Sequence, residues 1–263
     1  MRVRLEWLAV SIRETVYSPL QNAVVWLAAG LHGHEPADSV LGALTELFGP
    51  GQTLDDAAPL TDVLAFLRHC GAHETDAGLR LVLSGPGDAP RLPARSPAAA
   101  AAAVGPGAVV VEGTDPTVYH ALVPRAPTDG SPVVWERFSG PAPLPAPDYL
   151  SPGEADRLLT QATNRATDLI DAVGYRPDPK VKSPRLTVGT LGDFYDTPGL
   201  PGSVPPRAAK LFARADRVAA IVETLPERIG DHSLDPQLLA LGGPVRRARV
   251  AGVDYAVREL ARG

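Results

Sequence analysis

The chain has 263 residues, 44% of them hydrophobic, which is enough to bury a substantial core and argues against wholesale disorder. Its net charge of −5 disfavours a dedicated DNA- or RNA-binding protein, because such proteins are usually basic. Cys70 is the only cysteine, so an intramolecular disulfide is excluded and a reducing compartment is favoured.

The first residues predict neither a signal peptide nor a membrane anchor. Arg2, Arg4 and Glu6 interrupt the apolar residues there, and the apolar run at 23–29 is far shorter than the roughly 20 residues of a membrane span. We therefore expect a soluble, cytoplasmic protein that has no membrane partner.

The balance of basic residues is unusual. Lys180, Lys182 and Lys210 are the only lysines among the 25 basic residues, and alanine, proline and glycine are abundant. These preferences follow GC-rich codons and indicate a GC-rich genome, such as that of an actinomycete. The number of arginines is therefore no evidence of nucleic-acid binding.

The chain opens with one expected strand and one well-delimited helix. Residues 2–10 alternate apolar and charged side chains, which is typical of a half-buried strand, although a helix also fits the pattern. Ser18, Pro19 and Gln21 have the spacing of a capping box, so we expect a helix that begins there and ends near Gly30.

Two further helices are predicted over residues 36–49 and 59–71. Each begins near a proline, ends at a glycine and carries an apolar stripe with helical spacing. Together with the first helix they form an N-terminal helical layer.

The middle of the chain predicts a sheet. Four short runs are rich in β-branched residues, and turn-forming residues separate the last three, at 79–83, 108–112, 117–123 and 133–138. Short connections favour antiparallel neighbours, so we expect a meander. Ser96 and Pro97 introduce an alanine run at 98–103 that predicts a short helix or a low-complexity insert.

A proline-rich connector at 139–150 leads into the most clearly delimited helix, over residues 151–173. Ser151 and Glu154 form a second capping-box pattern, and an apolar stripe runs the length of the helix. This stripe predicts a central scaffold packed between the sheet and the next helix, with three nearly fully buried side chains, namely Leu158, Leu169 and Ile170.

Two more helices are expected over residues 206–224 and 244–262. The fold class is therefore α+β, with the N-terminal helical layer, a central antiparallel β-meander and C-terminal helices packed on the sheet. We expect one domain over residues 1–263, with a possible division near 139–150 into a part at 1–138 and a mainly helical part at 151–263.

Motifs of common enzyme families are absent from the sequence. There is no GxxxxGK[ST] phosphate loop, no GxSxG nucleophile elbow and no CxxC pair. These absences leave open an enzyme whose site residues are scattered along the chain.

Histidines gather at the ends of the first three predicted helices. His32 and His34 follow the first helix, while His69, Cys70 and His73 end the third. Imidazole and thiolate are transition-metal ligands, and an up-down arrangement of the helices would bring the two groups together. The hypothesis is a metal site, with zinc as the candidate; the alternative is helix capping or simple solvation of these side chains.

Two loops carry further candidates. Asp193, Tyr195 and Asp196 could supply acid–base chemistry, although Asp-Thr-Pro-Gly is also a common turn sequence. A second loop at 230–236 holds a serine, a histidine and two aspartates, which are more simply explained as a turn and a helix cap. Arginines on the two C-terminal helices could form a basic face for an anionic partner; they are Arg207, Arg214, Arg217, Arg246, Arg247, Arg249, Arg258 and Arg262. The alternative is a solvated face with charge pairs four residues apart, here Arg258 with Asp254.

The sequence therefore favours a non-enzymatic binding or accessory protein that acts on a protein or small-ligand partner, without a cofactor. The alternative is an enzyme, such as a metal-dependent hydrolase, that uses the histidine cluster or the loop around Asp193 and Asp196.

Overall fold

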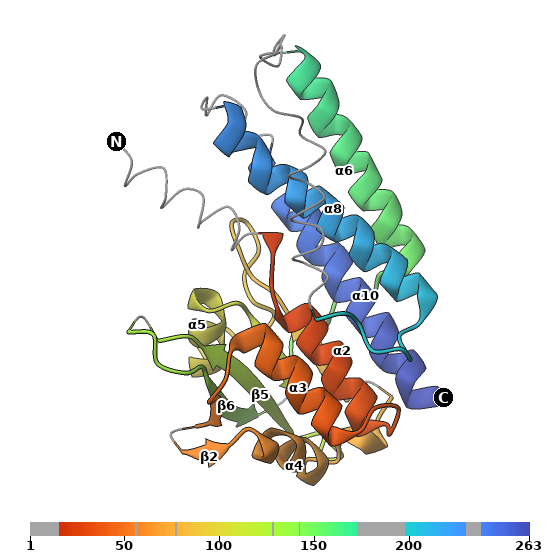
Figure 1. Ribbon diagram of the computed structural model, residues 1–263. Helices are drawn as coiled ribbons and strands as arrows, with labels where there is room; N and C mark the ends of the chain where they lie inside the picture. The colour runs from red at the N-terminus through yellow and green to blue at the C-terminus, as the bar shows by residue number, and fades with distance from the viewer. Residues whose placement is uncertain are drawn as a thin grey trace.

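The computed structural model describes residues 16–55, 57–76, 78–127, 129–141, 143–172, 198–229 and 238–263. In this part, seven α-helices surround one six-stranded mixed sheet, with helices at both ends of the chain (Figure 1). The predicted α+β class is confirmed. The expected strand at 2–10 lies outside the described residues.

The three N-terminal helices form where they are predicted, as α2 (Leu20–Leu31), α3 (Ala37–Phe48) and α4 (Thr61–His69). The predicted capping box at the start of α2 is wrong in one respect. Ser18 Oγ accepts a hydrogen bond from the Leu20 N–H, but Gln21 turns into the interior, where its side-chain carbonyl accepts from Arg249. The hydrogen bond from the buried Arg249 thus replaces the bond that Gln21 would make at the helix N-terminus.

The predicted meander is confirmed. Four strands pair antiparallel in chain order, namely β3 (Leu79–Val82), β4 (Ala108–Val111), β5 (Val118–Arg125) and β6 (Val134–Pro141). The sheet also contains a short hairpin that was not predicted, formed by β1 (Thr53–Leu54) and β2 (Ala58–Pro59). Because β1 pairs parallel with β6, the sheet is mixed, and β3 forms its other edge.

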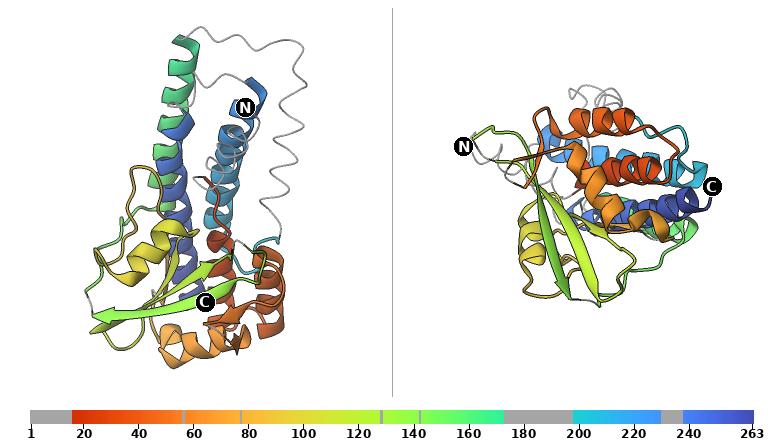
Figure 2. Two further views of the ribbon diagram at one scale, coloured as in Figure 1. Left: turned by 90° about the vertical axis from the view of Figure 1, so that its left-hand side faces the viewer. Right: turned by 90° about the horizontal axis from the view of Figure 1, so that it is seen from below.

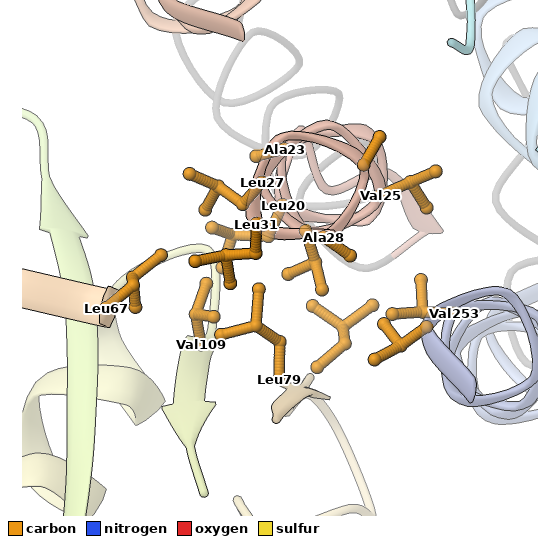
Figure 3. Packing of buried hydrophobic residues seen from close by; sticks show 14 of the residues in the cluster. Leu20, Ala23, Val25, Leu27, Ala28, Leu31, Leu67, Leu79, Val109 and Val253 are labelled. Atoms are coloured by element: carbon orange, nitrogen blue, oxygen red, sulfur yellow. The ribbon is translucent and has the colours of Figure 1, made fainter. Parts of the chain in front are cut away.

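Both faces of β3 and β4 are covered. Alternate side chains, among them Leu79 and Val109, pack against α2, α4 and the C-terminal helix α10 (Gly242–Arg262) (Figure 3). The intervening side chains, including Val82 and Val110, pack against α5 (Pro97–Val104), whose first turn is capped by Ser96 as predicted. Figure 2 shows α5 on one side of the sheet and the N-terminal helices on the other.

The C-terminal part is a bundle of three long helices, α6 (Pro152–Ala172), α8 (Pro206–Ile229) and α10 (Gly242–Arg262). The capping box of α6 is confirmed: Ser151 Oγ accepts from the Glu154 N–H, and the Glu154 carboxylate accepts from the Ser151 N–H. The helices α6 and α8 run in the same direction and α10 runs in the opposite one (Figures 1 and 2).

The predicted role of α6 as the central scaffold is wrong. It is α10 that packs on β3 and α2, while α6 and α8 pack on α10. As a result α6 buries only small or widely spaced side chains, such as Ala155, Leu159 and Ala166. Leu169 is 47% exposed, and Leu158 and Ile170 are half-buried. An apolar stripe predicts that a helix packs against something, but not which part of the stripe is covered.

Candidate functional site

A pocket of about 390 Å³ lies where the edge strand β3 meets α10. We call it the strap pocket, because residues 143–150, the strap, form one of its walls. Its other walls come from β3, from the loop that follows this strand, and from one face of α10. The lining side chains that carry charge are Arg80, Asp88, Arg91, Asp148, Arg246, Arg247 and Asp254.

The loop after β3 shapes one wall through a tight turn. Residues 85–88 read Gly-Pro-Gly-Asp, and Gly87 has a φ of 81°, which is the backbone of a type II turn. The ends of the turn are joined by two backbone hydrogen bonds between Gly85 and Asp88. Proline at the second position and glycine at the third explain why the sequence turns here.

This turn holds the buried guanidinium of Arg246. Arg246 Nη2 lies 2.6 Å from Asp88 Oδ2 and donates to the Pro86 carbonyl at 3.1 Å. A Cβ on Gly85 would lie only 2.5 Å from Arg246 Nη1, so a side chain at this position would displace the guanidinium. The turn and α10 are thereby fixed to each other at the pocket.

The strap is held by two arginines. Arg80 Nη1 donates to Glu112 at 2.7 Å, and its Nη2 donates to the Pro145 carbonyl at 3.4 Å. Arg91 donates to the Ala146 carbonyl at 3.0 Å and forms an ion pair with Asp148. Prolines at 143, 145 and 147 suit a segment that contributes carbonyl acceptors without belonging to the sheet.

Asp254 is the most unusual group in the pocket. Its residue is 8% exposed, and within the described part of the chain its Oδ1 has no hydrogen-bond partner. Burial raises the pKa of Asp254 to about 6, although the charges of Arg258 and Arg80 act in the opposite direction. Buried polar atoms normally have a partner, so this carboxylate is a candidate binding group.

Arg247 lies at the opposite end of the pocket from Asp254. It is exposed, and among the described residues it makes no hydrogen bond or ion pair. The remaining pocket arginines each face a carboxylate. Arg247 is therefore the cation that is most available to an anionic ligand.

The predicted histidine cluster is only partly assembled. Burial lowers the pKa of His32, and the nearby charges of His34 and His73 lower it further, so these three side chains lie in one neighbourhood. His34 Nε2 donates to the Leu260 carbonyl at 2.8 Å, and His73 lies 3.7 Å from the Glu74 carboxylate. Capping of the α10 C-terminus accounts for His34 without a metal.

His69 and Cys70 belong to a second neighbourhood. Burial lowers the pKa of His120, and among the smaller causes is the nearby charge of His69; His120 also bonds Ser139 Oγ at 2.7 Å. Burial raises the pKa of the Cys70 thiol, which disfavours the thiolate that a metal needs. In the part of the chain that the structure describes, no three His, Cys, Asp or Glu side chains are placed to hold a metal ion. A zinc site shared by all five residues stays a prediction.

The other candidates divide in two groups. Asp193, Tyr195 and Asp196 lie outside the described residues, as does the loop at 230–236. Of the arginines proposed as a basic face, Arg246 and Arg249 are buried in polar networks, whereas Arg207, Arg214 and Arg217 are exposed on α8.

The residues of the strap pocket were missed as a site. One signal was present in the sequence: Arg246, Arg249 and Asp254 interrupt the apolar stripe of α10, beside Val245, Ala248 and Val253. Charged residues on the buried face of a helix are expensive to bury and indicate either internal partners or a site.

The fold and the pocket define an α+β protein with a recessed polar pocket between its sheet and its C-terminal helices. Two family models match the chain: Rv1486c-like protein, N-terminal domain, over residues 21–149, and Rv1486c-like protein, C-terminal domain, over residues 153–250. The chain belongs to the Rv1486c-like family. No curated protein and no solved structure matches it.

The boundary between the two matched regions falls at the strap and the start of α6. The strap pocket takes β3, the turn and most of the strap from the first region, and Arg246, Arg247 and Val250 from the second. Pockets often lie at such junctions. No helix within the described residues is long and apolar enough to cross a membrane.

Proposed function

We propose that the protein binds a small organic molecule in the strap pocket. The observation that carries the proposal is the buried Oδ1 of Asp254, which has no partner among the described residues although it lines a cavity. An orphaned buried carboxylate oxygen costs free energy in the empty pocket. A ligand N–H or O–H that hydrogen-bonds it would remove that cost.

The charges of the pocket favour a ligand with two different ends. Arg80, Arg91 and Arg246 each form an ion pair with a carboxylate, so they add little net charge to the pocket and mainly fix the positions of its walls. Asp254 and Arg247 are the charged groups of the pocket that remain available to bind the ligand. We therefore infer a molecule with a cationic or hydrogen-bond-donating group for Asp254 and an anionic group for Arg247.

Helix geometry gives the distance between the two ends. Arg247, Val250 and Asp254 line the pocket and are three and four residues apart, so they share one face of α10. Seven residues of helix span about 10 Å. Apolar side chains also line the pocket, among them Leu81, Pro145 and Val250. An extended molecule with an apolar middle fits this arrangement.

A series of ω-amino acids of increasing length tests the proposal, with alkylamines and fatty acids of matching length as probes that carry only one end. Calorimetric titration should give the tightest binding at an intermediate length. Asp254→Asn and Arg247→Gln should each weaken it at least tenfold. The matched controls are Asp62→Asn, at a half-buried position on α4, and Arg157→Gln, at an exposed position on α6; both positions lie outside the pocket.

Two results would contradict the proposal. One is equal affinity for the two-ended and one-ended probes. The other is an equal loss of affinity in the control variants. Binding without any length dependence would show that the two groups do not act on one molecule.

The alternative function is catalysis. A carboxyl with a pKa near 6 is half-ionised close to neutrality and could transfer a proton, so Asp254 would be the general acid or base. The described lining residues of the strap pocket include no serine, threonine, cysteine or histidine, which favours binding over nucleophilic catalysis. The metal-dependent hydrolase built on the histidines remains a separate hypothesis, which elemental analysis of the purified protein would test directly.

We also propose a cytoplasmic location, which is supported by Cys70 being a free thiol and the only cysteine.

A further inference from the structure

The second surface of interest is a long groove between α6 and α8, independent of the strap pocket. Its volume is about 970 Å³, and its surface is mostly carbon. It runs beside residues 151–163 of α6 and 207–221 of α8. We call it the bundle groove.

The rim of the bundle groove on α8 is basic. Arg207, Lys210, Arg214 and Arg217 all line it and are all exposed. Their spacing of three, four and three residues places them on one face of the helix. Among the described residues, Asp156 is the only acidic side chain that lines the groove, and it lies 3.2 Å from Arg214. The described groove therefore carries a clear excess of positive charge.

Apolar side chains lie along the same face of α8. Leu211 and Val218 lie one residue after Lys210 and Arg217; both are buried in the bundle core and form the floor of the groove. Ile221, which is half-buried, continues the stripe by one further turn. Apolar positions repeated every three to four residues, with charges beside them, form the pattern of a helix that packs against another helix. Within the described residues the bundle has three helices, and a fourth would complete a common architecture.

We propose that the bundle groove binds an acidic amphipathic helix of a partner protein. The groove extends along 15 residues of α8, from Arg207 to Ile221, a rise of about 21 Å, which matches roughly four turns of a partner helix. Apolar side chains of the partner would lie on the mostly carbon surface of the groove, over the half-buried Ile221 and above the buried floor of Leu211 and Val218. Its carboxylates would lie beside Arg207, Lys210 and Arg217 and would mainly set the association rate and the salt dependence.

Other occupants fit less well. The two longer segments of this chain outside the described residues are not acidic: residues 1–15 and 173–197 each have one more basic than acidic side chain. A flat anionic membrane would contact the arginines on the rim but not the recessed floor between two helices. A partner helix reaches both.

The test uses a synthetic 18-residue amphipathic peptide with leucines at heptad positions a and d and glutamates at e and g. The matched control peptide carries lysines in place of the glutamates. Fluorescence anisotropy should show binding of the acidic peptide only, with an affinity that falls at least tenfold between about 50 and 300 mM salt. The double substitution Arg207→Glu and Arg217→Glu should weaken binding at least tenfold.

Arg157→Glu is the control variant, because Arg157 is exposed on α6 but does not line the groove. Unchanged thermal unfolding of both variants shows that the bundle is intact. Equal binding of the acidic and basic peptides, or an equal loss in Arg157→Glu, overturns the proposal. The proposal is also overturned if the acidic peptide does not bind the wild-type protein and the double substitution abolishes binding to phosphatidylglycerol vesicles. The same conclusion holds if the peptide does not bind and the double substitution abolishes self-association.

Discussion

The sheet-containing part and the helical bundle bury their interiors in different ways. In the first, large side chains such as Leu27 and Leu79 fill the space between α2 and the sheet (Figure 3), and Trp135 packs edge-to-face against Phe48 on α3. In the second, the contacts between helices are rich in alanine, as at Ala155, Ala166, Ala215, Ala219, Ala248 and Ala251. Small side chains allow close approach, but they remove less apolar area from water.

Polar contacts compensate in the bundle. Arg249 is 1% exposed, and its Nη1 lies 2.6 Å from both Gln21 Oε1 on α2 and Asp216 Oδ1 on α8. Its Nε donates to the Val16 carbonyl at 3.1 Å. One side chain on α10 therefore connects α2, α8 and the segment that precedes α2. The comparison suggests that the sheet part provides most of the hydrophobic stability, while the bundle depends on a few specific contacts.

The largest expected effects come from one substitution made in each region. Leu27 and Leu159 are both fully buried. Leu27→Ala should destabilise the protein by up to about 5 kcal/mol, because rigid neighbours leave a cavity. Leu159→Ala should cost about 3 kcal/mol, because helices with small contact residues can close the gap more easily. Urea unfolding measures both changes in unfolding free energy. Equal losses for the two variants would contradict the contrast between the sheet part and the bundle.

Removal of the central arginine should have an effect of similar size. Arg249→Ala leaves Asp216 in the interior without its guanidinium, which typically costs about 3–5 kcal/mol. Arg157→Ala, on the exposed face of α6, should cost less than about 0.5 kcal/mol. Denaturant unfolding of the two variants tests this. A small loss of unfolding free energy for Arg249→Ala would contradict the stabilising role of the Arg249 contacts.

At the junction of the two regions, a substitution should be stabilising. Burial raises the pKa of Asp254 to about 6, so the fold disfavours the carboxylate. The wild-type protein therefore keeps the full benefit of the neutral carboxyl below about pH 4 and loses it as the pH rises to about 6. Asp254→Asn should be more stable at pH 7 by up to about 3 kcal/mol, and the advantage should vanish below about pH 4.

Thermal unfolding of both proteins across pH 3.5–8 measures the difference. Parallel stability curves would show that Asp254 does not titrate near pH 6. A stabilised variant that no longer binds the probes of the strap pocket would be typical of a functional group that the fold accommodates at a cost.

The smallest expected effect concerns the stripe of α6. Leu169 is 47% exposed, so Leu169→Ala should change the free energy of unfolding by less than about 1 kcal/mol. A loss above about 2 kcal/mol would show that this part of the stripe is covered and that α6 is anchored more firmly than the comparison implies. Urea unfolding measures the change, and Leu159→Ala, a substitution at a buried position of the same helix, serves as the internal standard.

Local signals predicted the elements well. Capping at Ser96 and Ser151 and the β-rich runs from 79 to 138 correctly indicated the helices and the meander, because these features act over a few residues. The hairpin of β1 and β2 was missed, since two-residue strands carry almost no pattern. The burial of α6 was wrong because a stripe does not reveal which neighbouring helix covers it.

The site was harder to predict, because its residues meet only in the folded chain. Arg80 and Asp254 are 174 positions apart and have no spacing that marks them as a pair. Asp254 appeared only as a helical neighbour of Arg258. The histidines formed a visible cluster in sequence, yet His34 has a capping partner and His69 faces His120. The closeness of the histidines in sequence was easier to see than the pocket residues, but it said less about which side chains meet in the folded chain.

The most direct test of the account is an NMR titration of the Asp254 carboxyl carbon, in the free protein and with 6-aminohexanoate as the probe. We predict a pKa near 6 in the free protein, caused by burial. The ammonium group of the probe should lower this pKa by about one unit or more, since an adjacent opposite charge stabilises the carboxylate. A pKa near 4 in the free protein, or a pKa that stays near 6 while the probe binds, would contradict the assignment of Asp254 as the ligand-binding group of the strap pocket.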